Sequence, residues 1–206
     1  MMEKIITFKN SAEAIGSLDN GGRFYNVLTK PNDEIVSLSE VGKVAGLFFE
    51  KQKAILFLDL AIAALDEEAK QDIVSKFDKD LQANYNKYKP HWLLPSMVKT
   101  KGVTGANTVI TGIPHLIDSN SELNGFIFIP AGKALVMVPI FDEYDIYEIR
   151  DEQHSETFII GNKRGKEKLP EKKLKVGGVL KEMKAKKDDK AALDRFLEIN
   201  YFVDED

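Results

Sequence analysis

The sequence contains no cysteine, and this absence removes several kinds of chemistry. Thiol nucleophiles, cysteine-ligated zinc or iron–sulfur centres and disulfide bonds are all excluded. Histidine is also scarce: His91, His115 and His154 stand far apart, and none belongs to a motif that presents two metal ligands on one helix. We therefore expect neither a bound metal nor a cofactor. Any catalysis would rest on carboxylate, hydroxyl, histidine or lysine side chains.

Long hydrophobic runs are absent too. The apolar stretch near the N-terminus, Ile5 to Phe8, is too short for the core of a secretory signal. The most apolar window, Val44 to Leu65, contains four charged side chains, among them Glu50 and Asp59. Each such charge costs about 2.5–3.5 kcal/mol at the centre of a bilayer. These features predict a cytoplasmic protein without a transmembrane segment.

The chain has no large excess of charge of either sign. Its 29 Lys+Arg and 33 Asp+Glu give a formal net charge of -4 and a pI near 5.5. Proteins that bind nucleic acid over a broad surface are usually strongly basic, so a nucleic-acid partner is not expected. With 206 residues, 43% of them hydrophobic, the chain needs no disulfide or metal to bury a stable core. One large domain and two small ones both remain open.

Residues 1–90 have the pattern of a mainly helical part. Short helices are predicted at Ser11 to Leu18 and from Ser39 onward, with Ser37 or Ser39 as the cap of the second. Ala54 to Leu65 is apolar on more than one helix face, which indicates an enclosed helix, although a strand at 54–58 remains open. One helix is predicted from Asp66 to Pro90, packed on the preceding segment as a helical hairpin with a turn near 64–66. A single long bent helix is the alternative.

Residues 91–206 have the pattern of an antiparallel β-rich part. Strands are predicted at 107–113, 126–129, 134–138, 144–149, 157–160 and 173–180. Asn124-Gly125 and the segment 130–133 have the composition of tight hairpin turns. A capped amphipathic helix is predicted after Asp188-Asp189, and one helix over 179–199 is the alternative. The expected fold class is therefore α+β, with a helical part followed by an antiparallel β part closed by a C-terminal helix.

The order of elements after Trp92, about seven strands in hairpins and then one amphipathic helix, resembles the pleckstrin-homology superfold in outline. The resemblance rests on element order, without a diagnostic residue. It implies a bent β-sandwich that binds a phosphoinositide or a peptide. The lipid site of that family usually uses the first hairpin, which Lys99 and Lys101 would represent here.

Charge is segregated along the β part. Phe141 to Glu156 contains seven acidic residues and one arginine, whereas Lys163 to Lys187 contains eleven basic and three acidic residues. Alternation within 173–176 places lysines on one face of a strand and apolar residues on the other. The sequence thus predicts an anion-binding surface turned away from the acidic stretch 142–152; neutralisation of one block by the other is the alternative. Its candidate residues are Lys163, Arg164, Lys166, Lys172, Lys173 and Lys175.

Two classes of function fit these patterns. The first is a non-enzymatic cytoplasmic interaction module that binds a protein partner or an anionic surface. The second is a small hydrolase-type enzyme with a carboxylate, and a histidine, at the junction of the two parts. A module should expose a patch at a sheet edge, whereas an enzyme should have a concave pocket with convergent polar groups.

Overall fold

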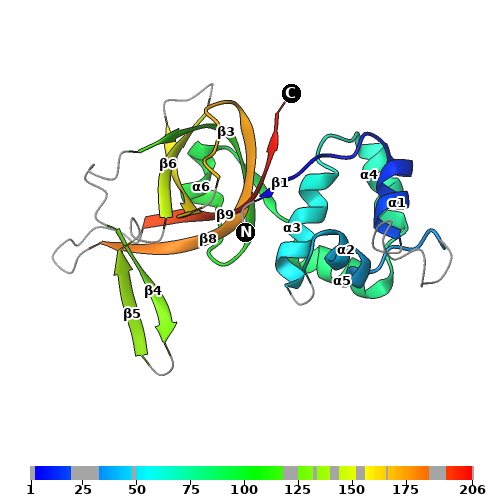
Figure 1. Ribbon diagram of the computed structural model, residues 1–206, viewed down its shortest axis with the longest axis horizontal. Coiled ribbons are helices and arrows are strands. Elements are labelled where there is room, and N and C mark those ends of the chain that lie inside the picture. Colours follow the sequence, from blue (N-terminus) through cyan, green and yellow to red (C-terminus); the bar gives the residue numbers. More distant parts are fainter. Residues whose placement is uncertain are drawn as a thin grey trace. The chain divides into compact units, whose positions relative to one another are not determined.

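The computed structural model describes residues 3–19, 33–47, 50–117, 125–131, 134–139, 144–151, 156–165, 167–185 and 194–205. The chain divides into two compact units. One unit is Ile5–Pro90, and the other is His91–Asp206 together with the N-terminal strand β1 (Glu3–Lys4). In Figure 1 the first unit is drawn as helices and the second as strands with one helix. The predicted α+β fold class is confirmed.

The first two helices begin where side-chain caps dictate. Helix α1 (Ser11–Leu18) follows Asn10, whose Oδ1 accepts a 2.8 Å hydrogen bond from Glu13 N. Helix α2 (Leu38–Val44) follows Ser37, which forms a capping box with Glu40. Such caps satisfy backbone N–H groups that have no partner within the helix. The predicted helix 11–18 is confirmed, and Ser37 is the cap of the second helix.

Helix α3 (Lys51–Ala61) forms the interior of the helical unit, which excludes the alternative strand at 54–58. Its buried side chains lie on several sides of the helix, as expected for an element enclosed by its neighbours. Ala54, Ile55 and Leu58 join one apolar core with α1, α2 and the helices that follow. The largest buried members from α3 are Ile55, Leu56, Leu58 and Leu60.

The single helix predicted from Asp66 to Pro90 is wrong, because the structure has two helices, α4 (Glu67–Ser75) and α5 (Lys79–Tyr88). The break has a local cause. Asp78 Oδ1 accepts a 2.7 Å hydrogen bond from Leu81 N and so caps a new helix. On either side of Phe77 the backbone bonds to Val36, which forms an isolated β-bridge with Phe77.

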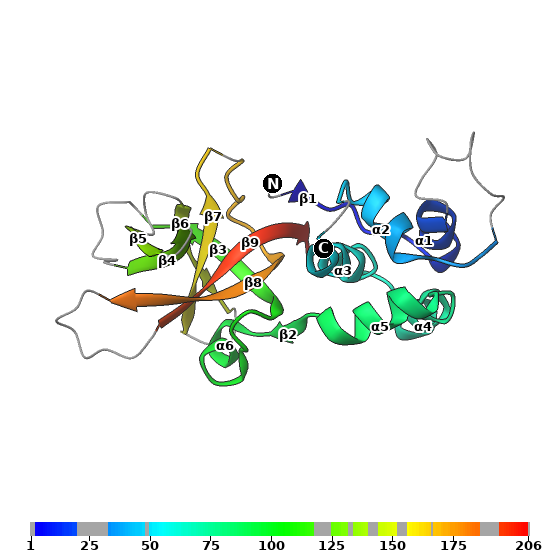
Figure 2. The same cartoon turned by 90° about the horizontal axis from the view of Figure 1, so that it is seen from below.

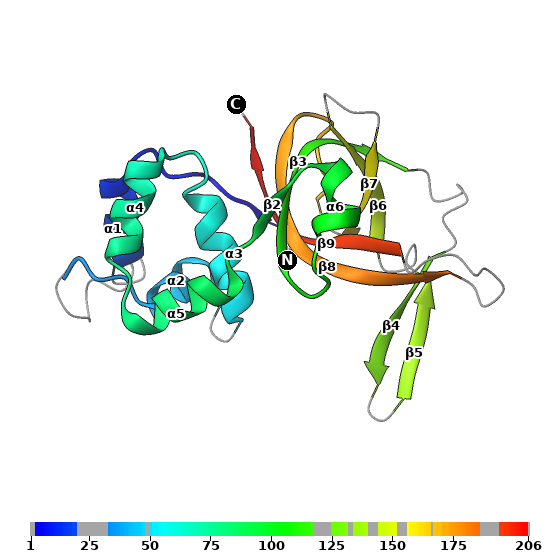
Figure 3. The same cartoon turned by 180° about the vertical axis from the view of Figure 1, so that it is seen from behind.

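The predicted turn near 64–66 is present, but α3 does not lie on α4 as a simple hairpin. Helix α3 packs on α2 and α5, whereas α4 packs on α1. Tyr85 Oη donates a 2.7 Å hydrogen bond to Asp59, and Lys51 Nζ lies 4.0 Å from Asp80. These two links join α3 to α5, and Figures 1 and 3 show the two helices crossing.

Five strands of the other unit close on themselves as a barrel. They are β3 (Asn107–Leu116), β6 (Tyr144–Arg150), β7 (Thr157–Lys163), β8 (Leu174–Ala185) and β9 (Asp194–Asp204). Pairing runs from β3 to β6, β7, β9 and β8, and from β8 back to β3. The β7–β9 pair is parallel, so the sheet is mixed rather than antiparallel throughout. Figures 1 and 3 show β8 and β9 wrapping around the other strands.

The barrel encloses an apolar core, and a helix contributes to it. Side chains from every barrel strand join this core, with Val98 of helix α6 (Pro95–Lys101). Helix α6 contacts β3, β7 and the short strand β2 (His91–Leu93), which pairs parallel with β3. Strand β1 pairs parallel with β9. Figure 2 shows both short strands beside the barrel.

The C-terminal helix predicted after Asp188-Asp189 is wrong, and so is the alternative helix over 179–199. Residues 194–204 form β9, which pairs with β8, β7 and β1. Phe196 and Leu197 suit helical spacing, but the aromatic and β-branched residues after them favour a strand buried on both faces. Their burial confirms this: Ile199, Tyr201, Phe202 and Val203 are all buried.

The pleckstrin-homology outline is not confirmed. That outline requires a closing C-terminal helix, which β9 replaces. Lys99 and Lys101, expected in the first hairpin, lie in helix α6. The turn predicted at Asn124-Gly125 lies partly outside the described residues, because Asn124 is not described. Gly125 opens β4 (Gly125–Ala131), which pairs with β5 (Ala134–Pro139) and with β8. The β4–β5 hairpin itself was predicted and is present.

Candidate functional site

The predicted basic residues lie in two separate groups. Lys163 pairs with Glu198, whereas Lys172 pairs with Asp204. These two carboxylates are six residues apart on β9, a distance of about 20 Å along a strand. Lys175 lies on β8 opposite Thr111, near the second group. Lys166 lies outside the described residues, so the structure brings together Lys163 with Arg164, and Lys172 with Lys173 and Lys175.

Carboxylates face both groups. Lys163 Nζ lies 3.3 Å from Glu198 Oε1, and Lys172 Nζ lies 2.7 Å from Asp204 Oδ2. Lys173 Nζ lies 3.9 Å from Glu205. Arg164 Nε lies 3.9 Å from Asp145, a member of the acidic stretch. The expected separation of basic and acidic residues is therefore wrong at Arg164, and neutralisation of one block by the other describes that contact.

Glu198 is the centre of the first group. Its side chain is 12% exposed, and Oε2 forms a close ion pair with Lys181. Tyr144 Oη donates a 3.0 Å hydrogen bond to Oε1. Burial alone would raise the pKa of the Glu198 carboxyl, but Lys181, the Tyr144 hydroxyl and Lys163 outweigh that effect and hold the pKa below its usual value. The carboxyl is thus fixed as an anion.

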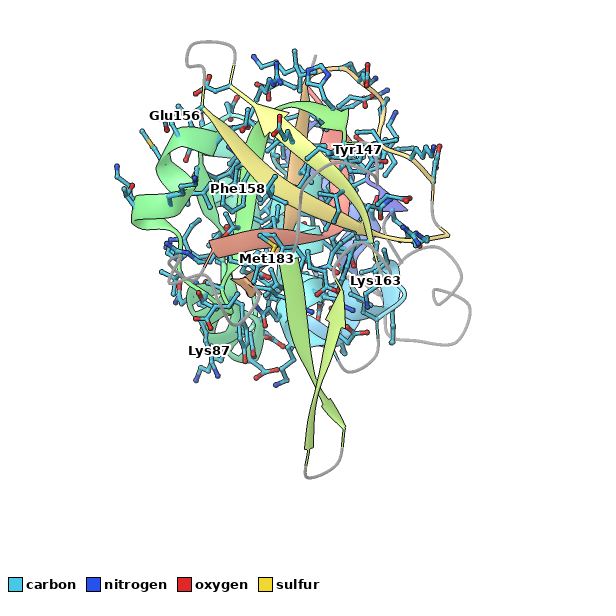
Figure 4. All side chains as sticks on the ribbon, turned by 90° about the vertical axis from the view of Figure 1, so that its left-hand side faces the viewer. Lys87, Tyr147, Glu156, Phe158, Lys163 and Met183 are labelled. Atoms are coloured by element: carbon cyan, nitrogen blue, oxygen red, sulfur yellow. The ribbon has the colours of Figure 1, made fainter. Side chains whose placement is uncertain are left out.

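This ion cluster adjoins an apolar cluster on the outer face of the barrel. The rings of Tyr144 and Phe196 meet edge to face, with centroids 5.5 Å apart. Both rings pack against Gly161, where an added Cβ atom would lie 3.2 Å from each ring. Met183 and Ile146 complete the buried set. Figure 4 labels Lys163 and Met183 of this face, and Tyr147 and Phe158 of the barrel core.

The electrostatics of this face hold Glu198 as a charged carboxylate rather than as a proton donor. A general acid or base needs a pKa near the working pH, and the anion of Glu198 is instead held by Lys163 and Lys181. Nothing in the sequence indicated Glu198, because its partners come from β6, β7 and β8. The only available signal was the β-rich composition of 196–203.

The enzyme alternative rests on residues that the structure describes only in part. Asp142, Glu143, Glu152 and His154 lie outside the described residues. His115 Nδ1 lies 3.9 Å from Glu171, with both side chains exposed. Among the described residues there is no group of three or more histidine and acidic side chains suited to a metal ion. A carboxylate site at the junction of the two parts stays a prediction.

One candidate cavity of the helical unit, of about 440 Å³, is lined by residues 33–35 and 75–79. Another, of about 270 Å³, lies near α2 and α3. Its apolar lining comes from Leu38, Gly42, Leu47 and Ala54. The volume is below the roughly 300–1,000 Å³ of most ligand pockets. Lys51 and Asp80, which also line it, lie 4.0 Å apart and so approach each other across its charged side.

The β4–β5 hairpin offers a different kind of surface. Strand β5 is the last strand of the sheet order and, among the described residues, pairs only with β4. Among the described residues, two residue pairs between β4 and β8 join the hairpin to the barrel, and Figures 1 and 3 show the hairpin extending away from the barrel. Neither strand contains a charged residue.

No helix within the described ranges has the length and apolar composition needed to cross a bilayer. Comparison of the sequence with models of protein families finds no match, and comparison with curated proteins finds none either.

Proposed function

We propose that the protein is a non-catalytic interaction module that binds a protein partner by adding a strand to the open edge of β5. One observation carries the proposal: an uncharged strand, Ala134–Pro139, ends the sheet without a second neighbour among the described residues. Edge strands carry a row of unpaired N–H and C=O groups, which an extended segment of another chain satisfies.

The composition of the hairpin supports this use. Natural edge strands are often protected from pairing by charged side chains or by proline. Strands β4 and β5 contain no charged residue, and the one proline of β5, Pro139, stands at its last position. A two-stranded hairpin is marginally stable in water, and a third strand stabilises it. A partner strand would therefore satisfy the backbone groups of the open edge and extend the sheet.

The described ion pairs favour a protein partner over an anionic surface. Lys163, Lys172 and Lys173 each face a carboxylate, so an anion would compete with an internal partner. Insertion of the hairpin into lipid is also unfavourable, because the unpaired edge of β5 would have no hydrogen-bond partner in hydrocarbon.

The test compares three probes on the native protein at high dilution. These are a fluorescein-labelled peptide of alternating valine and threonine, phosphatidylserine vesicles, and a random-sequence oligonucleotide, each at two salt concentrations. We expect binding of the peptide alone, with little dependence on salt. Salt-sensitive binding to vesicles or oligonucleotide, lost when Lys173 and Lys175 are changed to Glu, would contradict the protein-partner proposal.

A proline variant locates the binding site. Met137→Pro should abolish peptide binding, whereas Met137→Val, which keeps the backbone N–H, should retain it. Equal binding by the native protein and by Met137→Pro would show that the edge of β5 is not the site. Far-UV circular dichroism of both variants checks that the fold is retained.

A further inference from the structure

The register of the hairpin shows which backbone groups face the open edge. Ala131 pairs with Ala134 across a two-residue loop, and the residues that flank such a loop form a hydrogen-bonded pair. Hydrogen-bonded and non-hydrogen-bonded pairs then alternate, which makes Pro130↔Leu135 a non-hydrogen-bonded pair. This fits Pro130, which has no N–H to donate.

The same alternation makes Phe128↔Met137 and Phe126↔Pro139 non-hydrogen-bonded pairs. In such pairs the backbone N–H and C=O groups point away from the partner strand. Leu135 and Met137 therefore present a donor and an acceptor each to the open edge of β5. Pro139 presents an acceptor alone. The open edge thus has two complete positions, Leu135 and Met137, each offering both an N–H donor and a C=O acceptor. Val136 lies between them.

We propose that the strand that occupies this edge is β5 of a second copy of the chain, paired antiparallel about a two-fold axis. This inference rests on the proposed function, because it uses the same edge. Antiparallel self-pairing places residues of the same strand opposite one another across the two-fold axis, so a strand with like charges would repel its copy. Strand β5 is uncharged along its whole length and so meets that requirement.

The positions of the donors select one register. Pairing of Leu135 with Met137 of the second copy uses every complete position on both strands, and each such pair exchanges two hydrogen bonds. A register shifted toward Pro139 would leave an acceptor opposite a residue without an N–H. In the selected register Val136 lies on the two-fold axis, opposite Val136 of the second copy. The result is a four-stranded sheet made from two hairpins.

The size of the contact sets the expected affinity. A six-residue strand pairing with its copy gives a small interface, and interfaces below roughly 1,200 Å² are typical of weak or transient complexes. We therefore expect a reversible dimer with a dissociation constant of about 1–100 µM. Sedimentation velocity across that range should show a weight-average mass that rises with concentration.

Met137→Pro provides the first test of the dimer, because it removes an N–H that faces the open edge and leaves the bonds between β4 and β5. We expect this variant to stay monomeric at every concentration, and Met137→Val to dimerise as the native protein does. A native protein that stays monomeric, or a Met137→Pro variant that dimerises equally, would overturn the inference.

The absence of cysteine allows a second test that reads the register directly. Non-hydrogen-bonded residues across an antiparallel pair have Cα atoms about 4.5 Å apart, within disulfide range. Val136→Cys should therefore form a covalent dimer under mild oxidation. Val138→Cys is the matched control: in this register it lies four residues out of line with its copy, at about 13 Å. Equal crosslinking of the two variants would overturn the register.

The outcomes separate this inference from the proposed function. A native protein that remains monomeric yet binds the valine–threonine peptide in a Met137-dependent way contradicts self-pairing and supports strand addition by another protein. If the native protein does not bind the peptide, and the Met137→Pro variant still dimerises, both the self-pairing inference and the proposed function are contradicted.

Discussion

The guanidinium of Arg195, at the start of β9, donates a 2.6 Å hydrogen bond to the carbonyl oxygen of Lys99 in the last turn of α6. A second 2.6 Å hydrogen bond runs from the same group to the carbonyl oxygen of Gly102, the C-cap. Carbonyls at a helix C-terminus lack partners within the helix and carry partial negative charge. Arg195 therefore fixes the end of the helix that contributes Val98 to the barrel core.

Arg195→Ala removes both of these hydrogen bonds. Hydrogen bonds from a charged donor contribute about 1.5–3 kcal/mol each, and water will replace part of this loss at a surface position, so we expect a decrease in the free energy of unfolding of about 1–3 kcal/mol. Urea denaturation measures it. The control is Arg150→Ala, which removes an exposed arginine with one 3.3 Å contact to Glu148. An equal loss from both variants would contradict a capping role for Arg195.

Glu198→Gln tests the ion cluster on the barrel face. Because the pKa of Glu198 is lowered by folding, its contribution to stability is present above the pKa of the unfolded state and is lost as the pH falls through the folded-state pKa. We expect the variant to unfold about 1–3 kcal/mol more easily at pH 7. The difference between the two proteins should begin to shrink near the unfolded-state pKa of glutamate, about 4.3, and should vanish below the lowered folded-state pKa.

Thermal unfolding of native protein and Glu198→Gln over a series of pH values shows this convergence. The matched control is Glu182→Gln, an exposed position on β8. A difference between native protein and Glu198→Gln that stays constant down to acid pH would indicate lost packing rather than lost charge.

Two glycines should respond oppositely to the same substitution. A Cβ atom at Gly178 would lie 2.1 Å from the carbonyl oxygen of Glu198, where the β8–β9 register shifts. Gly178→Ala should therefore cost about 3 kcal/mol or more by forcing the two strands apart. Gly16, inside α1, has open space around the same position. Gly16→Ala should stabilise by about 0.5–1 kcal/mol. Chemical denaturation of both variants measures whether each substitution lowers or raises the free energy of unfolding.

The break between α4 and α5 is tested at its cap. Asp78→Ala removes the acceptor for Leu81 N and should cost about 0.5–2 kcal/mol, whereas Asp78→Asn, a comparable cap, should cost far less. Asp72→Ala, at an exposed position within α4, is the control. If Asp78→Ala leaves the urea midpoint unchanged, the Asp78 cap does not stabilise the start of α5.

Local chemistry was readable from the sequence wherever a few adjacent residues decide the structure. The caps at Ser37 and Asp66 and the end of α5 before Pro90 are of this kind. The break at Asp78 was missed because the bridge that accompanies it comes from Val36, far away in the chain. At Phe196 and Leu197 the residue spacing suits both a helix and a strand. Pairing with β7 and β8 on either side determines that this segment is a strand.

The same reason explains what was missed at the candidate sites. The Tyr144–Glu198 hydrogen bond spans 54 residues, and no spacing rule connects such positions. The six basic residues were grouped by their nearness in sequence, whereas pairing with Glu198 and Asp204 separates them along β9. The hairpin at 126–138 was found because its turn and its alternation are local.

The pairing of β1 with β9 affects the order in which the two units fold during synthesis. Glu3 pairs with Tyr201, so β1 is synthesised about 200 residues before the strand with which it pairs. Barrel closure also requires β9, which lies between β7 and β8. The helical unit, whose residues 5–90 are contiguous, completes its contacts long before this. During synthesis the nascent chain therefore carries a folded helical unit while the barrel strands remain unpaired, and unpaired strand edges are exposed to aggregation in that interval.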